Sequence, residues 1–263
     1  MDFNSKVIWI TGASSGIGKA LALQLSQYNC KLILSSRRRE SLQKVKMDCK
    51  HPENVAILDF DLALYGNMNN VVNDALKLFN GIDILVNNGG ISQRSLIKDT
   101  NIMVDKKLME VDYLGTVALS KAVLPHFMAK KNGHFVTVTS IMGKFGSPYR
   151  SGYCGAKHAL HGFFDVLRQE HEQDGINVTL VCPGFVNTNV SKNALTGDGS
   201  SLNTQDAATE NGLDVAVFCT KMISAIKRKK HEVYIGEKEI FGVYVKRFFP
   251  RLLHKIVLKS NVR

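Results

Sequence analysis

Short runs of apolar residues alternate along this chain with longer segments whose apolar residues recur at helical spacing. The runs are KVIWI, KLILS, VAILD, DILVN, HFVTVTS, NVTLVC and EVYI. Each run is nearly continuous in apolar residues, which is typical of strands that are covered on both faces. Seven such runs joined by mostly helical connections predict an α/β fold, a doubly wound, seven-stranded parallel sheet with helices on both faces.

One long segment lacks this alternation. Residues 188–212 follow the sixth predicted strand and are rich in Gly, Ser, Asn and Thr. A loop of this length inside a compact domain is usually a lid, a binding loop or disordered. We expect a substrate lid, and its apolar residues favour an apolar substrate: Leu195, Leu202 and Leu213.

A carboxylate interrupts the apolar face of another predicted helix. The segment MEVDYLGTVAL, residues 109–119, has helical spacing, and Asp112 shares one face with Val111, Gly115 and Leu119. A charge on a buried face is costly unless it is paired, solvated or protonated. The sequence therefore indicates that Asp112 has a specific partner.

The composition is that of an ordinary globular protein. The chain has 263 residues, of which 44% are hydrophobic and 22% charged. We find no run of ~18 uncharged apolar residues that would predict a membrane span, and no signal peptide before the first strand. Five cysteines occur without a CxxC pair, which favours reduced thiols in an intracellular protein and no metal site. We expect a single domain over residues 1–238.

The net charge of +11 is concentrated near the C-terminal end, where 11 Lys and Arg face three Asp and Glu from Lys227 to Arg263. This uneven distribution argues against a nucleic-acid partner. Residues 239–263 predict a basic amphipathic tail, in which Phe248, Leu252, Lys255 and Ile256 fall at helical spacing and Pro250 breaks or starts a helix. Two interpretations stay open: peripheral contact with an anionic membrane, or a helix packed on the domain or a partner subunit.

The first predicted strand leads into a glycine loop and an amphipathic helix, VIWITGASSGIGKALALQL. Gly12, Gly16 and Gly18 allow the backbone to approach a pyrophosphate, which a helix N-terminus attracts. The second strand ends at Ser36, followed by Arg37 to Arg39, where an acidic residue would hold the ribose of NAD. A hydroxyl and a guanidinium suit a 2′-phosphate instead, so we predict NADP(H). A solvated start of a helix explains Arg38 and Arg39 better.

Tyr153 and Lys157 are four residues apart, so they share one face of a predicted helix. Taken alone, this pair is an ordinary lysine beside a core tyrosine. However, Ser140 lies 13 residues before Tyr153, and the segments TGASSGIG, NNGG and CPG surround these residues in order. Together these motifs resemble the short-chain dehydrogenase/reductase family over nearly the whole chain. TNVSKNALTGDGS and YVKRFFPRLL are similar to its dehydrogenase/reductase member 7 and 7B branch.

The resemblance implies a Rossmann-like fold and an NADP-dependent oxidoreductase that interconverts a hydrophobic carbonyl compound (lipid, steroid or retinoid-like) and its alcohol. In this pattern Tyr153 is the general acid/base, Ser140 holds the substrate carbonyl oxygen, and Lys157 binds the cofactor ribose and passes the proton on. An ammonium near a phenol favours the phenolate and makes the phenol a better acid. Asp112 stands where the family has an Asn that holds a water beside the Lys, and it completes the candidate catalytic set.

The resemblance also implies a cofactor-binding set, a homo-oligomer, and a location in the cytoplasm or peripherally on the endoplasmic reticulum or another organelle membrane. A non-catalytic NADP-binding or membrane-surface interaction protein that keeps the fold remains the alternative, and Asp112 favours it. The implied cofactor residues are Gly12, Ser14, Ser15, Gly16, Ile17, Gly18, Ser36, Arg37, Asp61, Asn88, Tyr153, Lys157, Pro183, Gly184, Val186 and Thr188.

Overall fold

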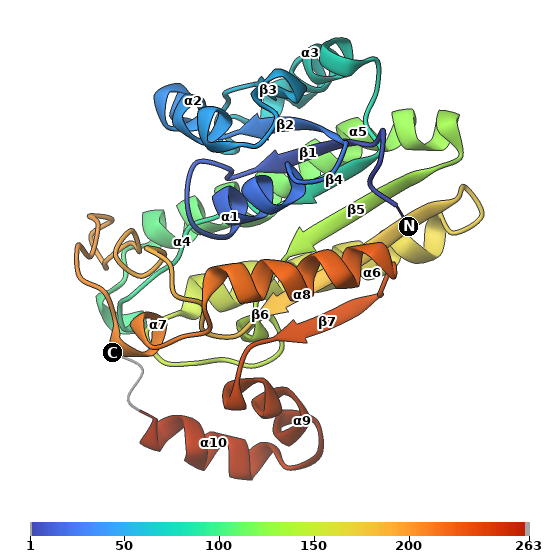
Figure 1. Cartoon of the computed structure of the whole chain (residues 1–263). Coiled ribbons are helices and arrows are strands. Elements are labelled where there is room, and N and C mark those ends of the chain that lie inside the picture. Colours follow the sequence, from blue (N-terminus) through green and yellow to red (C-terminus); the bar gives the residue numbers. More distant parts are fainter. Residues whose placement is uncertain (1, 261–263) are drawn as a thin grey trace.

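Seven parallel strands form one sheet in the computed structural model, which describes residues 2–260 (Figure 1). Their order is β3-β2-β1-β4-β5-β6-β7, so the sheet grows in both directions from β1. This confirms the predicted fold class, and each strand coincides with a predicted apolar run. The strands are β1 (Val7–Thr11), β2 (Lys31–Ser35), β3 (Val55–Ile57), β4 (Ile84–Asn87), β5 (Gly133–Val138), β6 (Ile176–Pro183) and β7 (Glu232–Ile235).

Helices cover both faces of the sheet, which explains why the central strands are apolar throughout. On one face, Leu21, Val45 and Met222 pack into a core with strand residues such as Ile8 and Val136. The helices of this face are α1 (Gly16–Leu25), α2 (Arg39–Asp48) and α8 (Val215–Lys227).

The second core lies on the other face and is rich in aromatic side chains. Phe127 and Phe164 pack on either side of Phe135, with ring centroids 4.9 and 6.3 Å away, and Trp9 is fully buried in the same core. The Trp9 indole N–H donates to Ser35 Oγ at 2.8 Å, which satisfies the polar edge of this ring. The helices of this face are α3 (Met68–Phe79), α5 (Thr116–Lys130) and α6 (Ser151–Glu170).

The helix predicted around Asp112 has an irregular centre. The helix α4 (Ile102–Leu108) continues directly into a π-helical segment, η4 (Met109–Gly115), and then into α5. The wider π turn shifts the register of the hydrogen bonds at Asp112 without ending the helix. Such turns are common at functional sites. Short 3-10 turns occur at η1 (Pro52–Asn54), η2 (Tyr65–Asn67), η3 (Ile97–Asp99), η5 (Ile141–Gly143) and η6 (Lys238–Ile240).

The long polar loop contains only one short helix, α7 (Ala207–Glu210), and runs beside the carboxyl end of the sheet (Figure 1). After β7 the chain forms a helical hairpin, α9 (Phe241–Phe248) and α10 (Pro250–Lys259). Pro250 starts α10, one of the two roles predicted for this proline, and Phe248 ends the preceding helix, so Phe248 lies on a different helix from Leu252, Lys255 and Ile256. The last three residues of the predicted tail, 261–263, lie outside the described part.

Within residues 2–260, no helix has both the length and the apolar character needed to cross a bilayer.

Candidate active site

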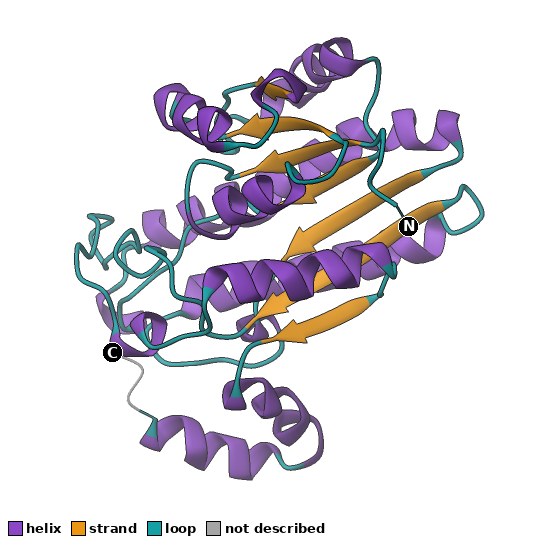
Figure 2. Ribbon diagram, viewed as in Figure 1, coloured by secondary structure: helices purple, strands orange, loops and turns teal. Residues whose placement is uncertain are grey.

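A cavity of about 640 Å³ opens where the strands end, next to the loops toward which the strand arrows point in Figure 2. This is the usual binding place in a parallel α/β sheet. The predicted site residues that line it are Gly12, Ser14, Ser15, Gly16, Ile17, Ser36, Arg37, Asp61, Asn88, Ser140, Tyr153, Lys157, Pro183, Gly184, Val186 and Thr188. Two predicted residues, Gly18 and Asp112, are not part of its wall.

The glycine loop has the close approaches that its sequence predicts. Gly12 has a φ of +65°, and a Cβ there would lie 2.7 Å from the Cα of Gly89. A Cβ on Gly18 would lie only 2.4 Å from the carbonyl oxygen of Gly12, so this glycine lets α1 pack under the loop. Asn88 Nδ2 donates to the carbonyl oxygen of Thr11 at 2.9 Å, which ties β4 to the loop.

The basic residues after β2 divide into two groups. Arg37 and Arg38 both line the cavity beside Ser36, whereas Arg39 lies outside and pairs with Asp59, with Nη1 2.5 Å from Oδ1. Arg38 and Arg39 are both exposed and stand at the start of α2, as the expectation of a solvated helix start has it, and Arg38 additionally lines the cavity. Two guanidinium groups stand at this end of the cavity.

Ser140, Tyr153 and Lys157 reach the same cavity from two elements. Ser140 follows β5, and its Oγ accepts the N–H of Met142 at 3.1 Å. Tyr153 and Lys157 lie one turn apart on α6, with the Lys157 Nζ 5.6 Å from the centroid of the Tyr153 ring. The Lys157 side chain is buried, and its Nζ donates to the carbonyl oxygen of Val138 at 3.4 Å.

Asp112 faces Lys157 from behind the cavity wall. Its Oδ2 lies 3.5 Å from the Lys157 Nζ, and its Oδ1 accepts the N–H of Ile91 at 2.8 Å. Within residues 2–260, no protein donor makes a hydrogen bond to Oδ2. The partner that the sequence indicates for Asp112 is thus the lysine of the Tyr-Lys pair. A Cβ on Gly90 would lie 3.2 Å from Oδ1 and 3.3 Å from Nζ, so only a glycine leaves this pair undisturbed.

Burial and charge act in opposite directions on this pair. Burial raises the pKa of the Asp112 carboxyl group, and the Lys157 ammonium and the Ile91 N–H oppose the shift without reversing it. Burial by itself would lower the pKa of Lys157, but the Asp112 carboxylate and Tyr153 raise it overall. Lys157 therefore carries its proton at neutral pH, next to the Asp112 carboxyl group.

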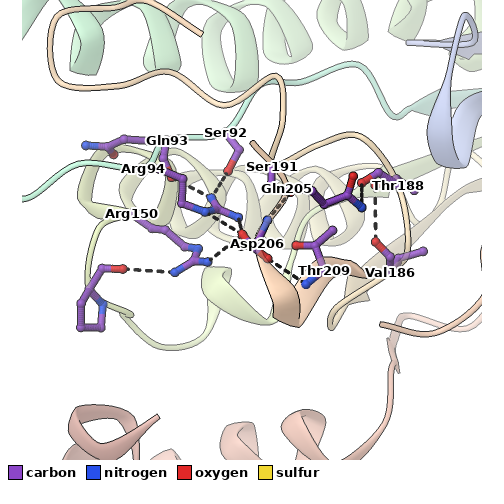
Figure 3. Close-up of polar contacts among 11 residues, drawn as sticks. Ser92, Gln93, Arg94, Arg150, Val186, Thr188, Ser191, Gln205, Asp206 and Thr209 are labelled. Carbon is purple, nitrogen blue, oxygen red and sulfur yellow. Dashed lines mark hydrogen bonds and ion pairs between the residues drawn. The ribbon is translucent and has the colours of Figure 1, made fainter. Parts of the chain in front are cut away.

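The predicted lid is held by a buried ion pair that no sequence motif indicates. Asp206 Oδ2 accepts from Nε and Nη2 of Arg94 at 3.0 and 2.7 Å, and Arg150 Nη2 lies 3.6 Å from the same oxygen (Figure 3). The other carboxylate oxygen of Asp206 accepts the N–H of Thr209, which starts α7. Arg94 and Arg150 also line the cavity, so this contact fixes the lid at the candidate active site.

A buried glutamine positions the helix that carries Tyr153. The Gln93 Oε1 accepts the N–H groups of Gly152 and Tyr153 at 2.8 and 3.4 Å, two donors that the first turn of α6 leaves without helical partners. The lid contacts the same segment, because Leu195 pairs with Gln93 in a short parallel bridge and lines the cavity. Of the three apolar lid residues expected to face the substrate, only Leu195 does so, and Leu213 packs instead against the core.

A glutamate from beyond β7 supports the loop after β6. The Glu239 Oε1 accepts the N–H of Phe185 at 2.9 Å. A Cβ on Gly184 would overlap the Glu239 side chain, which explains the glycine in this loop. Glu239 is the first residue of the predicted tail, so that segment takes part in shaping the cavity wall.

A second polar cluster lies next to the site without reaching the cavity. The His161 ring stands between Cys182 and Glu232, with Nε2 3.8 Å from Sγ and Nδ1 3.4 Å from Oε2. Lys144 Nζ lies 2.6 Å from the same carboxylate oxygen, and Tyr234 donates to its other oxygen. Burial would raise the pKa of Glu232, but these hydrogen bonds and the Lys144 charge lower it to about 2. The Lys144 ammonium already neutralises the carboxylate.

The cavity fits a dinucleotide at its glycine-loop end. The loop backbone approaches without side chains at Gly12 and Gly16, the helix α1 starts there, and Arg37 and Arg38 provide positive charge. At the other end, Ser140 and Tyr153 present hydroxyl groups. This arrangement can bind an anionic dinucleotide and hold a polar group of a second molecule next to it.

Comparisons with known proteins match this arrangement. The short chain dehydrogenase family matches residues 6–199 of this chain. The dehydrogenase/reductase SDR family protein 7-like of Anopheles gambiae is 43% identical over 241 residues, covering 89% of this chain and 75% of that protein. The human dehydrogenase/reductase SDR family member 7 is 40% identical over 256 residues, covering 95% and 76%. The resemblance indicated by the motifs is therefore confirmed.

A solved structure shares the whole fold at low sequence identity. A short chain dehydrogenase/reductase from Burkholderia phymatum, in complex with NAD, superposes with a TM-score of 0.84. It is 19% identical to this chain, and the match covers 100% of this chain and 98% of the other. At this identity the similarity concerns the fold alone.

Proposed function

Because this chain belongs to the short-chain dehydrogenase/reductase family, an oxidoreductase family that acts on CH–OH groups with nicotinamide cofactors, we propose that it interconverts a hydrophobic carbonyl compound and its alcohol with NADP(H). The observation that carries the proposal is the convergence of Ser140, Tyr153 and Lys157 on the cavity that also contains the glycine loop and Arg37. A non-catalytic NADP-binding protein could also use Lys157 to hold the cofactor, so the Ser140 and Tyr153 hydroxyl groups carry the argument for catalysis.

The preference for NADP(H) rests on the end of β2. Ser36, Arg37 and Arg38 line the cavity, and a carboxylate at this place would repel a 2′-phosphate. Arginine binds phosphate oxygens through its planar fork, and each such hydrogen bond is worth ~1.5–3 kcal/mol. Both guanidinium groups are within the same wall, so they favour the phosphorylated cofactor together.

Cofactor titration tests this preference. Arg37→Ala and Arg38→Ala should each weaken NADPH binding ~10-fold or more and leave NADH binding within about twofold. Arg39→Ala is the matched control, because Arg39 pairs with Asp59 and does not line the cavity. Equal loss of NADPH and NADH affinity in the first two variants would contradict the proposed phosphate contact.

The residues of the chain supply a route for the proton. The bound nicotinamide cofactor supplies the hydride that reduces the carbonyl carbon. Ser140 holds the carbonyl oxygen through its hydroxyl, and Tyr153 gives its phenolic proton to the developing alkoxide. The Lys157 ammonium, 5.6 Å from the Tyr153 ring centroid, stabilises the phenolate that remains. Water then returns a proton to the Tyr153 phenolate on the side where Asp112 and Lys157 meet. The oxidation of the alcohol runs through the same steps in reverse.

The substrate part of the cavity favours an apolar molecule. Apolar side chains from three segments line the cavity: Ile141, Met142, Phe185, Val190 and Leu195. Each additional buried methylene contributes ~0.8 kcal/mol, which corresponds to roughly fourfold in kcat/KM until the cavity is filled. We therefore expect kcat/KM for straight-chain methyl ketones to rise with chain length. A flat or falling series, with turnover of the shortest ketone retained, would contradict the apolar preference while leaving the reductase activity in place.

A further inference from the structure

The α9–α10 hairpin is fixed to the domain through one of its faces. Leu253 is only 5% exposed and packs with Ile141 and Phe145, next to Val243 and Val257. Gly242 allows the first helix to approach closely, since a Cβ there would lie 2.9 Å from the Phe145 ring. Because these side chains fill the attachment face, the position of the hairpin on the domain is defined.

The rest of the hairpin surface exposes large aromatic and aliphatic side chains. Phe241, Phe248 and Phe249 are 62%, 69% and 63% exposed, and Leu252 and Ile256 are about half exposed. Phe241 and Phe248 lie two turns apart on one row of α9, and Leu252 and Ile256 lie one turn apart on α10. An apolar patch of this kind on a protein surface usually marks an interaction site.

Basic side chains border this patch. Arg251, Lys255 and Lys259 follow each other at four-residue intervals on α10, about 100° around the helix from the row of Leu252 and Ile256. Lys246 and Arg247 add two charges on α9, and all five side chains are exposed. The sequence from Phe241 to Ser260 contains no Asp or Glu. The hairpin therefore combines an apolar row with an uncompensated positive border.

We propose that this hairpin docks the protein on an anionic lipid bilayer surface, with the phenylalanines among the lipid headgroups and the basic row against lipid phosphates or carboxylates. An aromatic and aliphatic row beside lysines and arginines is the pattern of helices that lie in the membrane interface. A second copy of this hairpin is a poorer occupant, because five cations would face five others. The positive charge of the hairpin thus favours an anionic partner, and its exposed apolar side chains favour lipid over a nucleic acid.

Docking in this way has a consequence for the cavity. Ile141 and Met142 contact the hairpin cluster on one side and line the cavity on the other. The hairpin that would contact the bilayer thus packs directly on a wall of the cavity. This proposal concerns where the protein sits and does not depend on the reaction that it catalyses.

Vesicle flotation with the full chain tests the proposal. Phosphatidylcholine vesicles with and without 30% phosphatidylserine are mixed with wild-type protein, with the double variant Phe248→Ser/Phe249→Ser, and with Arg251→Glu/Lys255→Glu. The matched control is Ile97→Ser/Ile102→Ser, which removes two side chains that are 78% and 74% exposed elsewhere on the molecule. All the substituted side chains are exposed, so far-ultraviolet circular dichroism should confirm that each variant folds.

We expect wild type to float with the phosphatidylserine vesicles and at least tenfold less with phosphatidylcholine alone. The partition coefficient of the phenylalanine variant should fall at least tenfold. Removing one cation is expected to lower the partition coefficient roughly fivefold, and the charge-reversal variant should lose more than this factor for each of its two substitutions. The control should stay within about twofold of wild type. Absence of flotation, equal loss in the control, or a hairpin-dependent dimer in sedimentation without lipid binding would overturn the proposal.

Discussion

Asp112 lies opposite Lys157, with its Oδ2 3.5 Å from the ammonium nitrogen, and both side chains are buried. The two residues come from different helical segments, and each would be costly alone in an apolar environment. Together they form a pair behind the wall that carries the Tyr153 hydroxyl group. Asp112, the carboxylate that interrupts an apolar helix face in the sequence, is therefore next to the lysine proposed to act on Tyr153.

Replacing Asp112 by Asn tests what this carboxylate does. The amide keeps the acceptor for the Ile91 N–H but removes the negative charge that offsets Lys157. The ammonium then favours the Tyr153 phenolate more strongly. We expect the acid limb of the pH–rate profile for alcohol oxidation to move to lower pH in Asp112→Asn, measured as kcat/KM. An unchanged limb would show that the carboxylate is protonated or does not act on this pair.

Adding one methyl group next to the pair provides a second test. In Gly90→Ala the new Cβ would press on Asp112 Oδ1 and Lys157 Nζ, at 3.2 and 3.3 Å. We expect kcat to fall ~10-fold while NADPH binding, measured by fluorescence titration, stays within about threefold. Gly155→Ala is the control, because a Cβ at this position on α6 meets open space. A normal kcat in Gly90→Ala would contradict the need for this packing.

The fold and the residues of the candidate active site were only partly predictable from the sequence. The strands were predictable because each is a short, nearly continuous apolar run, and Ser140, Tyr153 and Lys157 carry recognisable spacing. Arg94 and Asp206 are 112 residues apart and have no spacing pattern, so their contact follows only from how the lid folds back. The apolar spacing around Asp112 gives no sign of the π turn, because a change in hydrogen-bond register leaves the spacing of apolar residues nearly the same.

The buried contact between Asp206 and Arg94 predicts that replacing the Asp206 carboxylate by an amide strongly lowers the stability of the protein. Asp206→Asn leaves the Arg94 guanidinium buried without its carboxylate, which should lower the free energy of unfolding by about 3 kcal/mol. Because Asp206 also starts α7, we expect KM for the carbonyl substrate to rise as the lid loosens. Glu210→Gln, which changes an exposed acid in the same segment, should alter neither the midpoint of thermal unfolding nor KM. Equal behaviour of the two variants would contradict a lid held by Asp206.

The Glu232 cluster predicts a specific loss of stability in acid. Hydrogen bonds and the Lys144 charge outweigh burial and lower the pKa of Glu232 from 4.5 to about 2. A carboxylate with a lowered pKa stabilises the fold fully above its ordinary pKa, and this stabilisation is lost as the pH falls toward 2. Thermal unfolding of Glu232→Gln should therefore depend less on pH than wild type between about pH 5 and pH 3. The exposed Glu170→Gln should retain the wild-type slope, and an unchanged slope in Glu232→Gln would exclude this contribution.

The central claim is that Tyr153 passes a proton to a carbonyl compound reduced with NADPH in this cavity. It is tested most directly by the loss of NADPH absorbance during turnover of a long-chain methyl ketone, in wild type and in Tyr153→Phe. We predict turnover by wild type and a loss of at least 100-fold in kcat in the variant, with NADPH affinity within about threefold. Turnover at the same rate in both proteins, or tight NADPH binding with no turnover of any carbonyl compound by wild type, would contradict the account.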